Sequence, residues 1–380
     1  MSPFYEVKNV PVHSCLLMPT EQEARQFPRR DIVLGFCKQC GFISNMAFDP
    51  TVQAYSPIYE DQQCFSPTFN TFARDLANRL IRKYDLREKT IIEIGCGKGD
   101  FLLLLCELGR NRGVGIDPAI CAERLRSEAA NQATFIRDYY SERYANYHGD
   151  LVCCRHTLEH IHPVAEFVRA VRRAIGNRLN TVVFFELPET TRVLQELAFW
   201  DIYYEHCSYF SPGSLARLFR FCGFEVSDLT IEFDRQYLLI EARPTKILSD
   251  TPHALEENIE RMAAHVRYFS ENCRDKMRQW QRRVQQLAIA GKRIVVWGSG
   301  SKCVAFLTSL SLDNEITGVV DINPHRHDKF IPGVGKKIML PEHLPTLKPD
   351  FVIVMNPIYG DEIRQMLATL GVVPEIILLD

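Results

Sequence analysis

The chain has 380 residues and a formal net charge of -2, and 46% of its residues are hydrophobic while 24% are charged. This length exceeds what one ordinary core organises, so we expect two or three domains of a soluble globular protein. The nearly neutral charge excludes strong binding to nucleic acid or to an anionic membrane, and no uninterrupted apolar run is long enough to span a bilayer.

The cysteines and the N-terminus indicate a reducing compartment. The thirteen cysteines are too scattered for a disulfide scaffold. Four of them lie inside apolar, core-like segments: Cys96, Cys106, Cys153 and Cys154. The first residues, MSPFYEVKNVPVHS, lack the basic region and apolar core of a signal peptide. We therefore expect a cytoplasmic enzyme.

Residues 1–60 are rich in turns and contain two pairs of soft metal ligands. The runs DIVLGF and GFISNMAF predict short strands. Downstream, GFCKQCGF places Cys37 and Cys40 in a C-x-x-C-G knuckle that can set both sulfurs on one metal, and upstream PVHSC offers His13 and Cys15. Together the two pairs predict a small module with one structural, tetrahedral zinc. Two reduced thiols in a turn, or a redox pair, are the alternatives.

Residues 61–245 alternate between apolar strands and amphipathic helices, beginning with a helix capped by Ser66 and Pro67. The following segments are, in order, TIIEIGCG, GDFLLLLCELGR, GVGID, AICAERLRSEAA, TFIRD, DLVCCRH, PVAEFVRAVRRAI and NTVVFFELP. Fully apolar strands between such helices predict an α/β domain with a doubly wound parallel sheet covered on both faces. SLARLFRFCGFEVSDLTIEF and QYLLIEARP predict one more helix and two strands at the sheet edge.

A helical bridge and a second sheet complete the chain. Across residues 246–290, apolar residues from Leu255 to Leu287 recur in steps of three and four, which predicts one long helix, or two, with a single apolar seam. We expect this seam to pack on a neighbouring domain, the alternative being a coiled-coil dimer. Residues 291–380 repeat the α/β pattern, which predicts a smaller, Rossmann-like parallel sheet.

The first strand of the central domain runs into a glycine loop, EIGCGKGD. Gly95, Gly97 and Gly99 let the backbone turn tightly and let a ligand approach it closely. A dinucleotide fingerprint requires the order G-x-G-x-x-G ahead of an anionic pyrophosphate, whereas position 100 here is aspartate. Glu93, Asp100 and the loop backbone therefore favour a cationic, amine-bearing ligand.

Two further strand ends carry carboxylates. GVGID ends the second strand with Asp117, placed to accept hydrogen bonds from both hydroxyls of a ribose. TFIRD ends the third strand with Asp138, placed to accept one from an adenine amino group. The three strand ends outline one ligand site.

This series resembles the class I S-adenosylmethionine-dependent methyltransferases: EIGCGKGD matches the first motif, GIDP the second, IRD the third and DLVCCRHTLEHI the fourth. The resemblance implies S-adenosylmethionine lying over Gly95 to Gly99, with Asp117 on the ribose, Asp138 near the adenine and His156 of the fourth motif beside the donor. An NAD site or a structural turn is the alternative, and the agreement of four successive strand ends favours the methyl donor.

Methyl transfer from a sulfonium is an in-line displacement, so the protein must align the acceptor and remove its proton. The segment FWDIYYEHCSYFS, residues 199–211, places proton-handling side chains among apolar ones near the carboxyl ends of the strands. We predict His206 as the base, Glu205 as the group that orients it or holds the acceptor, and Tyr203 as the donor to a developing oxyanion. A hydrogen-bonded aromatic cluster that only stiffens a lid is the alternative.

The three regions together resemble the nucleotide-sugar C-methyltransferases of deoxysugar biosynthesis, through the N-terminal knuckle, IYYEHCSYFS, and WGSGSKCVAFL with GVVDINPHRHDKFIPGV. The resemblance implies that His206 removes a proton from the carbon beside a keto group, and it places Tyr59, His160 and His162 in the pocket. Two segments differ from the family pattern. HSC replaces its usual upstream C-x-x-C, and EFDRQYLLIEA replaces a His-Gly-Gly-Ser turn at the sugar, which leaves the acceptor open.

The C-terminal segment IVVWGSGSKCVAFL is similar to a dinucleotide loop, with Asp321 at a plausible distance to meet a ribose. Cys303 stands where a third glycine or alanine would let the helix pack closely, so a working NAD site is not expected. By resemblance this domain closes over the acceptor and binds its nucleotide part, and a structural cap is the alternative. Asn356 and Tyr359 stand at another strand end and are expected to face the cleft.

We therefore predict an S-adenosylmethionine-dependent methyltransferase that acts on carbon of a small-molecule acceptor, by resemblance a nucleotide-linked keto-sugar. We expect a monomer or homodimer without nucleic-acid or membrane partners. O- or N-methylation of another secondary metabolite, and a donor-binding protein without catalysis, are the alternatives.

Overall fold

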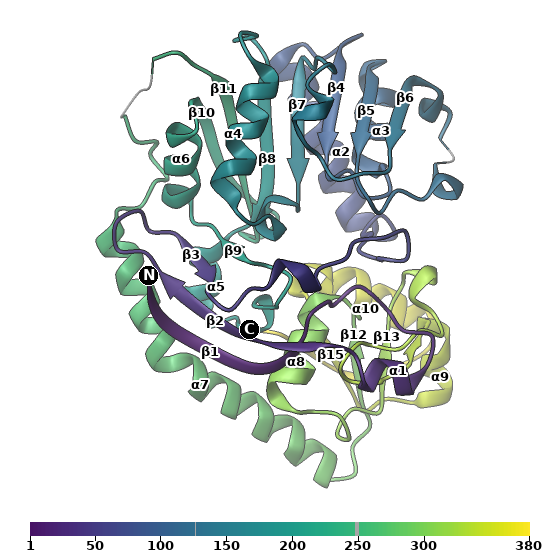
Figure 1. Ribbon diagram of the computed structural model, residues 1–380. Helices are drawn as coiled ribbons and strands as arrows, with labels where there is room; N and C mark the ends of the chain where they lie inside the picture. The colour runs from purple at the N-terminus through teal and green to yellow at the C-terminus, as the bar shows by residue number, and fades with distance from the viewer. Residues whose placement is uncertain (126, 248–250) are drawn as a thin grey trace.

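The computed structural model describes residues 1–125, 127–247 and 251–380. Its strands form three sheets, of four, seven and five strands. The seven-stranded and five-stranded sheets lie at opposite ends of the molecule, with the N-terminal strands packed beside the five-stranded sheet (Figure 1). Within the described ranges, no helix combines the length and the apolar character needed to cross a membrane.

The four-stranded sheet is antiparallel and has the order β1-β2-β3-β9. Its last strand, β9, comes from far along the chain. The elements of this region are β1 (Ser2–Pro11), α1 (Glu21–Arg25), β2 (Arg29–Phe36), β3 (Ile43–Asn45), the 3-10 turn η1 (Pro50–Val52) and β9 (Ser208–Tyr209). β2 and β3 confirm the two predicted short strands. Since β9 follows His206 closely, its pairing with β3 anchors the segment that carries the predicted base.

The predicted zinc site is wrong, because the antiparallel pairing of β1 with β2 separates its two halves. Ser2 pairs with Phe36, and Pro11 pairs with Arg29. The C-x-x-C pair follows one end of this ribbon and the upstream pair follows the other, so the 8 residues of β2 separate the pairs by roughly 25 Å. The four predicted ligands therefore do not form a metal-binding group in the part of the chain that the structure describes: His13, Cys15, Cys37 and Cys40.

Replacing Cys37 and Cys40 together by serine is expected to change the free energy of unfolding by about 0.5 kcal/mol or less. Cys40 is exposed and Cys37 is half-buried, and neither is part of a four-ligand site whose loss would open the sheet. Thermal unfolding combined with zinc analysis of the purified protein tests this. One zinc ion per chain in the native protein, lost together with the fold in the double variant, would contradict the expectation.

The seven-stranded sheet has the order β10-β11-β8-β7-β4-β5-β6. The strands from β8 to β6 are parallel, and β11 and β10 continue the sheet in antiparallel pairing. Its strands are β4 (Thr90–Ile94), β5 (Arg112–Ile116), β6 (Ala133–Ile136), β7 (Leu151–Arg155), β8 (Val182–Pro188), β10 (Phe224–Glu232) and β11 (Tyr237–Pro244). This confirms the predicted α/β sheet, with a mixed edge formed by the last two strands.

Helices cover both faces of this sheet because successive strand residues point to opposite sides. Ile92 and Phe185 belong to the core under α4 and α6, whereas Ile91 and Phe184 belong to the core under α2 and α3. The helices and 3-10 turns of the domain are α2 (Pro67–Tyr84), α3 (Asp100–Gly109), η4 (Glu142–Tyr144), η5 (Leu158–His160), α4 (Val164–Ile175), α5 (Thr190–Glu196), η6 (Phe199–Asp201) and α6 (Pro212–Phe221). As predicted, α2 starts at a Ser66 cap, whose hydroxyl accepts a hydrogen bond from a backbone N–H.

The helix predicted from AICAERLRSEAA is wrong for the residues described there. Two 3-10 turns take its place: η2 (Ala122–Arg124) and η3 (Glu128–Gln132). The Cys121 thiol donates to the Glu123 carboxylate, and the Ser127 hydroxyl accepts from the Ala129 N–H. Local side-chain bonds of this kind compete with the bonds of an α-helix. Residue 126 of this segment lies outside the described residues.

The five-stranded sheet of the C-terminal region is parallel throughout, in the order β14-β13-β12-β15-β16, which confirms the second Rossmann-like sheet. Its strands are β12 (Ile294–Trp297), β13 (Gly318–Val320), β14 (Ile338–Met339), β15 (Phe351–Val354) and β16 (Glu375–Leu378). Its helices and turns are α8 (Ser301–Leu310), η7 (Pro324–Arg326), η8 (Pro341–His343), α9 (Leu344–Leu347), η9 (Pro357–Tyr359) and α10 (Gly360–Thr369).

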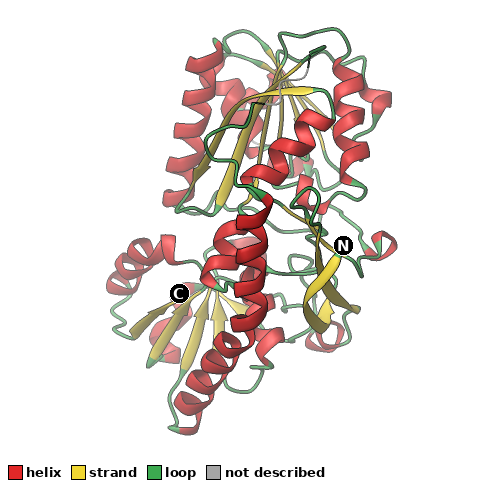
Figure 2. Ribbon diagram, turned by 90° about the vertical axis from the view of Figure 1, so that its left-hand side faces the viewer, coloured by secondary structure: helices red, strands yellow, loops and turns green. Residues whose placement is uncertain are grey.

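A single helix, α7 (Ile259–Ile289), connects the two ends of the molecule (Figure 2). Its predicted apolar seam is buried: Met262, Val266, Phe269, Cys273, Trp280 and Val284. These side chains pack with Tyr5 of β1 and Phe306 of α8 in one core. The seam is thus covered by neighbouring parts of the same chain, as predicted, and not by a coiled-coil partner.

Candidate active site

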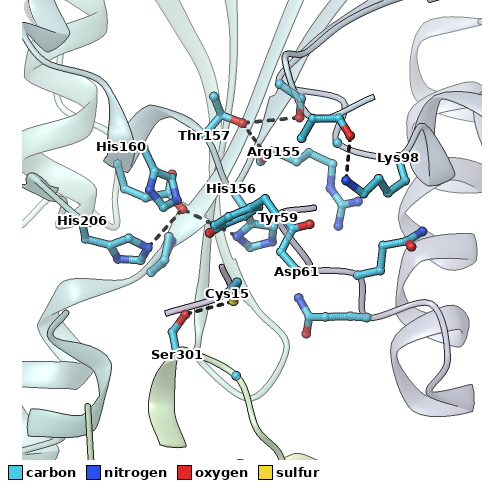
Figure 3. Close-up of a pocket in the computed structure, with 18 of the residues that line it drawn as sticks. Cys15, Tyr59, Asp61, Lys98, Arg155, His156, Thr157, His160, His206 and Ser301 are labelled. Atoms are coloured by element: carbon cyan, nitrogen blue, oxygen red, sulfur yellow. Dashed lines mark hydrogen bonds and ion pairs between the residues drawn. The ribbon is translucent and has the colours of Figure 1, made fainter. Parts of the chain in front are cut away.

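A cavity of about 860 Å³ lies where the three regions meet. Its wall includes residues that end parallel strands of both larger sheets: Ile94, Ile116, Pro188, Trp297 and Val354. Ligands bind at the carboxyl ends of strands in open α/β sheets. Figure 3 shows Tyr59, His160, His206 and Thr157 around this cavity, with Cys15 and Ser301 closing it from the N-terminal and C-terminal regions.

The glycine loop between β4 and α3 is bare on its cavity side. Gly95, Gly97 and Gly99 have positive φ angles of 70°, 55° and 88°. A Cβ on Gly95 would lie 2.0 Å from Oγ1 of Thr157, so no larger residue fits there. A Cβ on Gly97 would meet no atom within 4 Å, and Gly97 lines the cavity. The backbone is therefore open to close approach by a ligand.

Carboxylates surround this loop. Glu93 of β4 is 2% exposed, and its Oε2 has no hydrogen-bond partner among the described residues. Asp117 accepts from the N–H of Gly97 at 2.8 Å and from that of Ala119 at 2.6 Å. Glu93, Asp117 and Asp100 all line the cavity, so this side suits a cation better than a pyrophosphate.

The affinity for S-adenosylmethionine is expected to rise with pH up to about 8 and to level off above it, because burial raises the pKa of Glu93 to about 8. A bound cation favours the ionised carboxylate, so binding releases a proton wherever the free protein holds one. One linked proton gives at most about a tenfold change in affinity per pH unit. Calorimetry at several pH values tests this. The Glu93→Gln variant is the control, because it shows how much of the pH dependence of the affinity comes from this carboxyl group. An identical pH dependence in both proteins would contradict it.

Asp138 lies apart from the cavity, contrary to the prediction. Its carboxylate pairs with Arg143 and accepts from the Tyr144 hydroxyl, and it is absent from the cavity wall. The arginine five residues further along the chain draws the carboxylate away from the ligand site. The two residues that follow Asp138, Tyr139 and Tyr140, line the cavity and present aromatic rings there.

His156 follows β7 and lines the cavity. Its Nε2 lies 2.7 Å from Oε1 of Glu186, which also accepts from the Arg155 guanidinium at 2.8 Å. Burial alone would raise the pKa of Glu186, but Arg155 and His156 lower it to about 2. The ionised Glu186 therefore places negative charge beside the His156 ring at the end of the sheet.

His206 is a buried, neutral imidazole on the cavity wall. It is 4% exposed, and its ring centroid lies 4.2 Å from that of Tyr203 and 4.7 Å from that of His160. Burial, followed by the nearby His160, His156 and Lys302, holds the pKa of His206 well below its usual value. An imidazole that is neutral at pH 7 can accept a proton, which the predicted base requires. Tyr203 lines the same wall.

Glu205 contacts His13 rather than His206, so its predicted orienting role is wrong. The Ala54 N–H donates to Nε2 of His13, so the ring proton is on Nδ1 and donates to Oε2 of Glu205 at 3.1 Å. The Tyr59 hydroxyl donates to the same oxygen at 2.8 Å, and the Ser14 N–H donates to the other oxygen. Burial alone would raise the pKa of Glu205, but His13, followed by His160 and the Ser14 N–H, lowers it.

The carboxylate that faces the predicted base is Glu159. Its Oε1 lies 4.0 Å from Nε2 of His206 and 3.9 Å from Nδ1 of His156, and its Oε2 has no hydrogen-bond partner in the described part of the chain. Burial raises the pKa of Glu159 to about 7. Glu159, His160 and His206 also form a group whose ligand atoms lie close enough together for one metal ion.

The sequence prediction missed the roles of several residues in or beside the cavity wall. His13 and Cys15 were taken as metal ligands, but His13 supports Glu205 and Cys15 lines the cavity. Glu159 lies within the fourth motif, DLVCCRHTLEHI, directly before the predicted His160, and His160 and His162 do line the cavity. The position of Glu159 in that motif was the signal from which it could have been predicted. Asn356 and Tyr359 also line the cavity, as expected.

The sheet order, the bare glycine loop and the acidic strand ends define a class I methyltransferase domain. Residues 68–229 match the family described as methyltransferase domain, and residues 251–372 match the family described as C-methyltransferase C-terminal domain. The two matches together identify an S-adenosylmethionine-dependent methyltransferase, in which a C-methyltransferase C-terminal domain follows the methyltransferase domain.

Among characterised proteins, the chain is 27% identical over 287 residues to the C-methyltransferase NovU of Streptomyces niveus, covering 72% of this chain and 67% of that protein. Among solved structures, it is similar to the 1,6-didemethyltoxoflavin-N1-methyltransferase of Burkholderia thailandensis, with 19% identity, a TM-score of 0.36, and coverage of 46% of this chain and 79% of that one. The magnesium protoporphyrin IX methyltransferase of Synechocystis gives 15% identity, a TM-score of 0.36, and coverage of 49% and 91%.

Proposed function

We propose that this methyltransferase transfers its methyl group to a carbon atom beside the carbonyl group of a small molecule, and that this acceptor is a nucleotide-linked keto-sugar. The observation that carries the proposal is a neutral, buried histidine, His206, in the same cavity as the bare glycine loop. The C-methyltransferase C-terminal domain and the similarity to NovU favour carbon over oxygen or nitrogen as the acceptor atom.

The donor end of the cavity fits S-adenosylmethionine. Gly97 leaves room for a ligand against the backbone, and Glu93 supplies a buried carboxylate with an unpaired oxygen near it. Asp117 and Asp100 add negative charge on the same side, and His156 stands in the wall. When bound here, S-adenosylmethionine supplies a methyl group on a positively charged sulfur.

The acceptor end supplies the base and the oxyanion donor. His206 takes the proton from the carbon beside the carbonyl group, and the electron pair left on that carbon forms the new bond to the methyl carbon. The carbonyl oxygen gains negative charge as the proton leaves, and the Tyr203 hydroxyl donates to it. Burial raises the pKa of Tyr203 well above its usual value, so this hydroxyl keeps its proton. Glu159 stabilises the imidazolium that His206 becomes.

Tyr59 lines the pocket and is supported by Glu205. The Tyr59 hydroxyl is fixed by its bond to Glu205, and Glu205 is fixed in turn by His13. Because the three side chains are at most 7% exposed, this network holds the N-terminal segment against the reacting centre.

Deuterium exchange tests the carbon chemistry separately from methyl transfer. The protein saturated with S-adenosylhomocysteine in heavy water is expected to exchange the hydrogen on the carbon beside the ketone of a keto-sugar nucleotide, as followed by NMR. His206→Ala is expected to lose this exchange. If no keto-sugar nucleotide in a panel exchanges, and the labelled methyl group appears on oxygen or nitrogen, the proposal is overturned.

A further inference from the structure

The cavity is lined by acidic and by cationic side chains. Its donor side carries Glu93, Asp100 and Asp117, and the cations there are bonded within the protein: Lys98 donates to two backbone oxygens and Arg155 pairs with Glu186. Further cations line the cavity from α5 and from the C-terminal region: Arg192, Lys302 and Arg326. A cationic donor explains the acidic wall, whereas these cations call for a different ligand group.

Arg326, the third cation of these walls, is already neutralised and bonded. Its guanidinium donates to the Ser299 hydroxyl at 3.2 Å and to the backbone oxygen of Glu60, and it contacts the Cys15 sulfur at 3.5 Å. Asp321 lies 3.9 Å from it. These contacts tie the N-terminal segment to the C-terminal sheet, so Arg326 has a structural task.

Arg192 and Lys302, by contrast, share one buried carboxylate. Arg192 donates to Oδ2 of Asp201 at 2.5 Å, and Lys302 donates to Oδ1 of the same side chain. Arg192 also pairs with Glu196 at 3.0 Å, but that side chain is 41% exposed. The Arg192 side chain is 9% exposed, and its Nε–H is buried without a hydrogen-bond partner among the described residues. Among the described residues, Asp201 is the one hydrogen-bond acceptor of the Lys302 ammonium, which has three N–H bonds to donate.

This arrangement leaves N–H donors of two buried cations unused inside the protein. Arg192 and Lys302 share the buried Asp201, while Glu196, the second carboxylate of Arg192, is 41% exposed and screened by solvent. A buried donor without an acceptor is costly. Burial lowers the pKa of Lys302, which reflects the same cost. Lys302 lies in the first turn of α8, where the Gly300 cap offers no side-chain bond to the free N–H groups. A helix N-terminus of this kind attracts anions.

We propose that Arg192, Lys302 and the first turn of α8 form a subsite for a phosphoryl group carried by the acceptor. The inference rests on the proposed function and deepens it, because it names the part of the acceptor that is recognised. Asp201 begins the segment that continues to Tyr203 and His206, so an anion held here ties the acceptor down beside the base. Arginine and lysine donors match the oxygens of a phosphoryl group.

Calorimetry with inorganic pyrophosphate tests the subsite on the full chain saturated with S-adenosylhomocysteine. Pyrophosphate is expected to bind the native protein, and Lys302→Gln is expected to weaken this binding by roughly 10- to 100-fold. Lys302→Arg keeps the charge and is expected to bind within a few-fold of native. Arg235→Gln removes an arginine that is 60% exposed outside the cavity, and it serves as the matched control with unchanged binding.

Thermal unfolding and the affinity for S-adenosylhomocysteine show whether each variant keeps its fold and donor site. No pyrophosphate binding to the native protein, or equal binding to a folded Lys302→Gln variant, would overturn the subsite. Pyrophosphate is also expected to compete with the acceptor for the cavity. If pyrophosphate binds without lowering the affinity for the acceptor, the site binds free phosphate and the proposal is overturned.

The experiments distinguish a failure of the subsite from a failure of the proposed function. If a keto-sugar nucleotide is methylated with a KM that Lys302→Gln leaves unchanged, the function stands and the subsite falls. If pyrophosphate binding depends on Lys302 while no keto-sugar nucleotide is methylated, the subsite stands for another phosphorylated acceptor and the proposed sugar falls.

Discussion

Replacing His206 by alanine is expected to lower the rate of methyl transfer by roughly 100- to 10,000-fold, the usual contribution of a positioned general base. The affinity for the donor is expected to stay unchanged. His206 lines the cavity beside Tyr203, whereas the expected donor site is the glycine loop that follows β4. Single-turnover transfer from a labelled donor measures the rate.

Two further variants sharpen this test. His206→Gln keeps most of the side-chain volume and should show the same loss, which separates the proton chemistry from the cost of an internal cavity. His343→Ala removes an exposed histidine outside the cavity and should transfer at the native rate. Undiminished transfer by a folded His206→Ala variant with native donor affinity would remove His206 from the mechanism.

Alanine at Gly97 is expected to block the donor while keeping the fold, whereas alanine at Gly95 is expected to damage the fold itself. Both positions have positive φ, which costs an alanine about 1–2 kcal/mol. The added methyl group of Gly97→Ala projects into open cavity space, so the affinity for S-adenosylmethionine should fall by about tenfold or more. In Gly95→Ala the methyl group meets Thr157 at 2.0 Å, so overpacking adds about 1–3 kcal/mol to the loss of stability.

Thermal unfolding and calorimetry on the two variants separate these effects. The expected pattern is a small stability change with a large affinity change for Gly97→Ala, and a large stability change for Gly95→Ala. Native donor affinity in Gly97→Ala would show that the donor does not lie against this part of the loop.

The elements that local patterns specify could be predicted from the sequence. Apolar strands between amphipathic helices identified both parallel sheets, and the glycine loop lay where a strand with these glycines must turn. The seam of α7 was visible because its apolar residues repeat with the helical period. Residues 119–130 were misjudged since their helical pattern was opposed by side-chain bonds of Cys121 and Ser127, which no periodicity shows.

The partners within the site depend on contacts between distant segments, and those could not be read from spacing. His13 and Glu205 are 192 positions apart and meet because β3 pairs with β9, which brings the base segment under the N-terminal ribbon. The same ribbon carries Cys37 and Cys40 away from His13, so two ligand pairs with plausible spacing never share a metal. Similarly, Lys302 reaches Asp201 only because α8 of the C-terminal region packs against η6.

Glu205 and Glu159 further illustrate why contacts in the site could not be predicted from spacing. Glu205 stands next to His206 in sequence, so it was the natural choice to orient the base. The two residues lie at a turn, in which the His206 N–H donates to the Tyr203 oxygen, and the Glu205 side chain bonds to His13. Glu159 comes from the turn after β7 and supplies the carboxylate that faces the imidazole instead. The assignment therefore required the three-dimensional arrangement of the two strand ends.

The most direct measurement of the central claim uses S-adenosylmethionine whose methyl group carries ¹³C, incubated with the protein and keto-sugar nucleotides. NMR of the product is predicted to show the label as a methyl group bonded to the carbon next to the ketone, and His206→Ala is predicted to form almost none of it. A label bonded to oxygen or nitrogen, or a carbon-bound label formed equally well by the variant, would contradict the account.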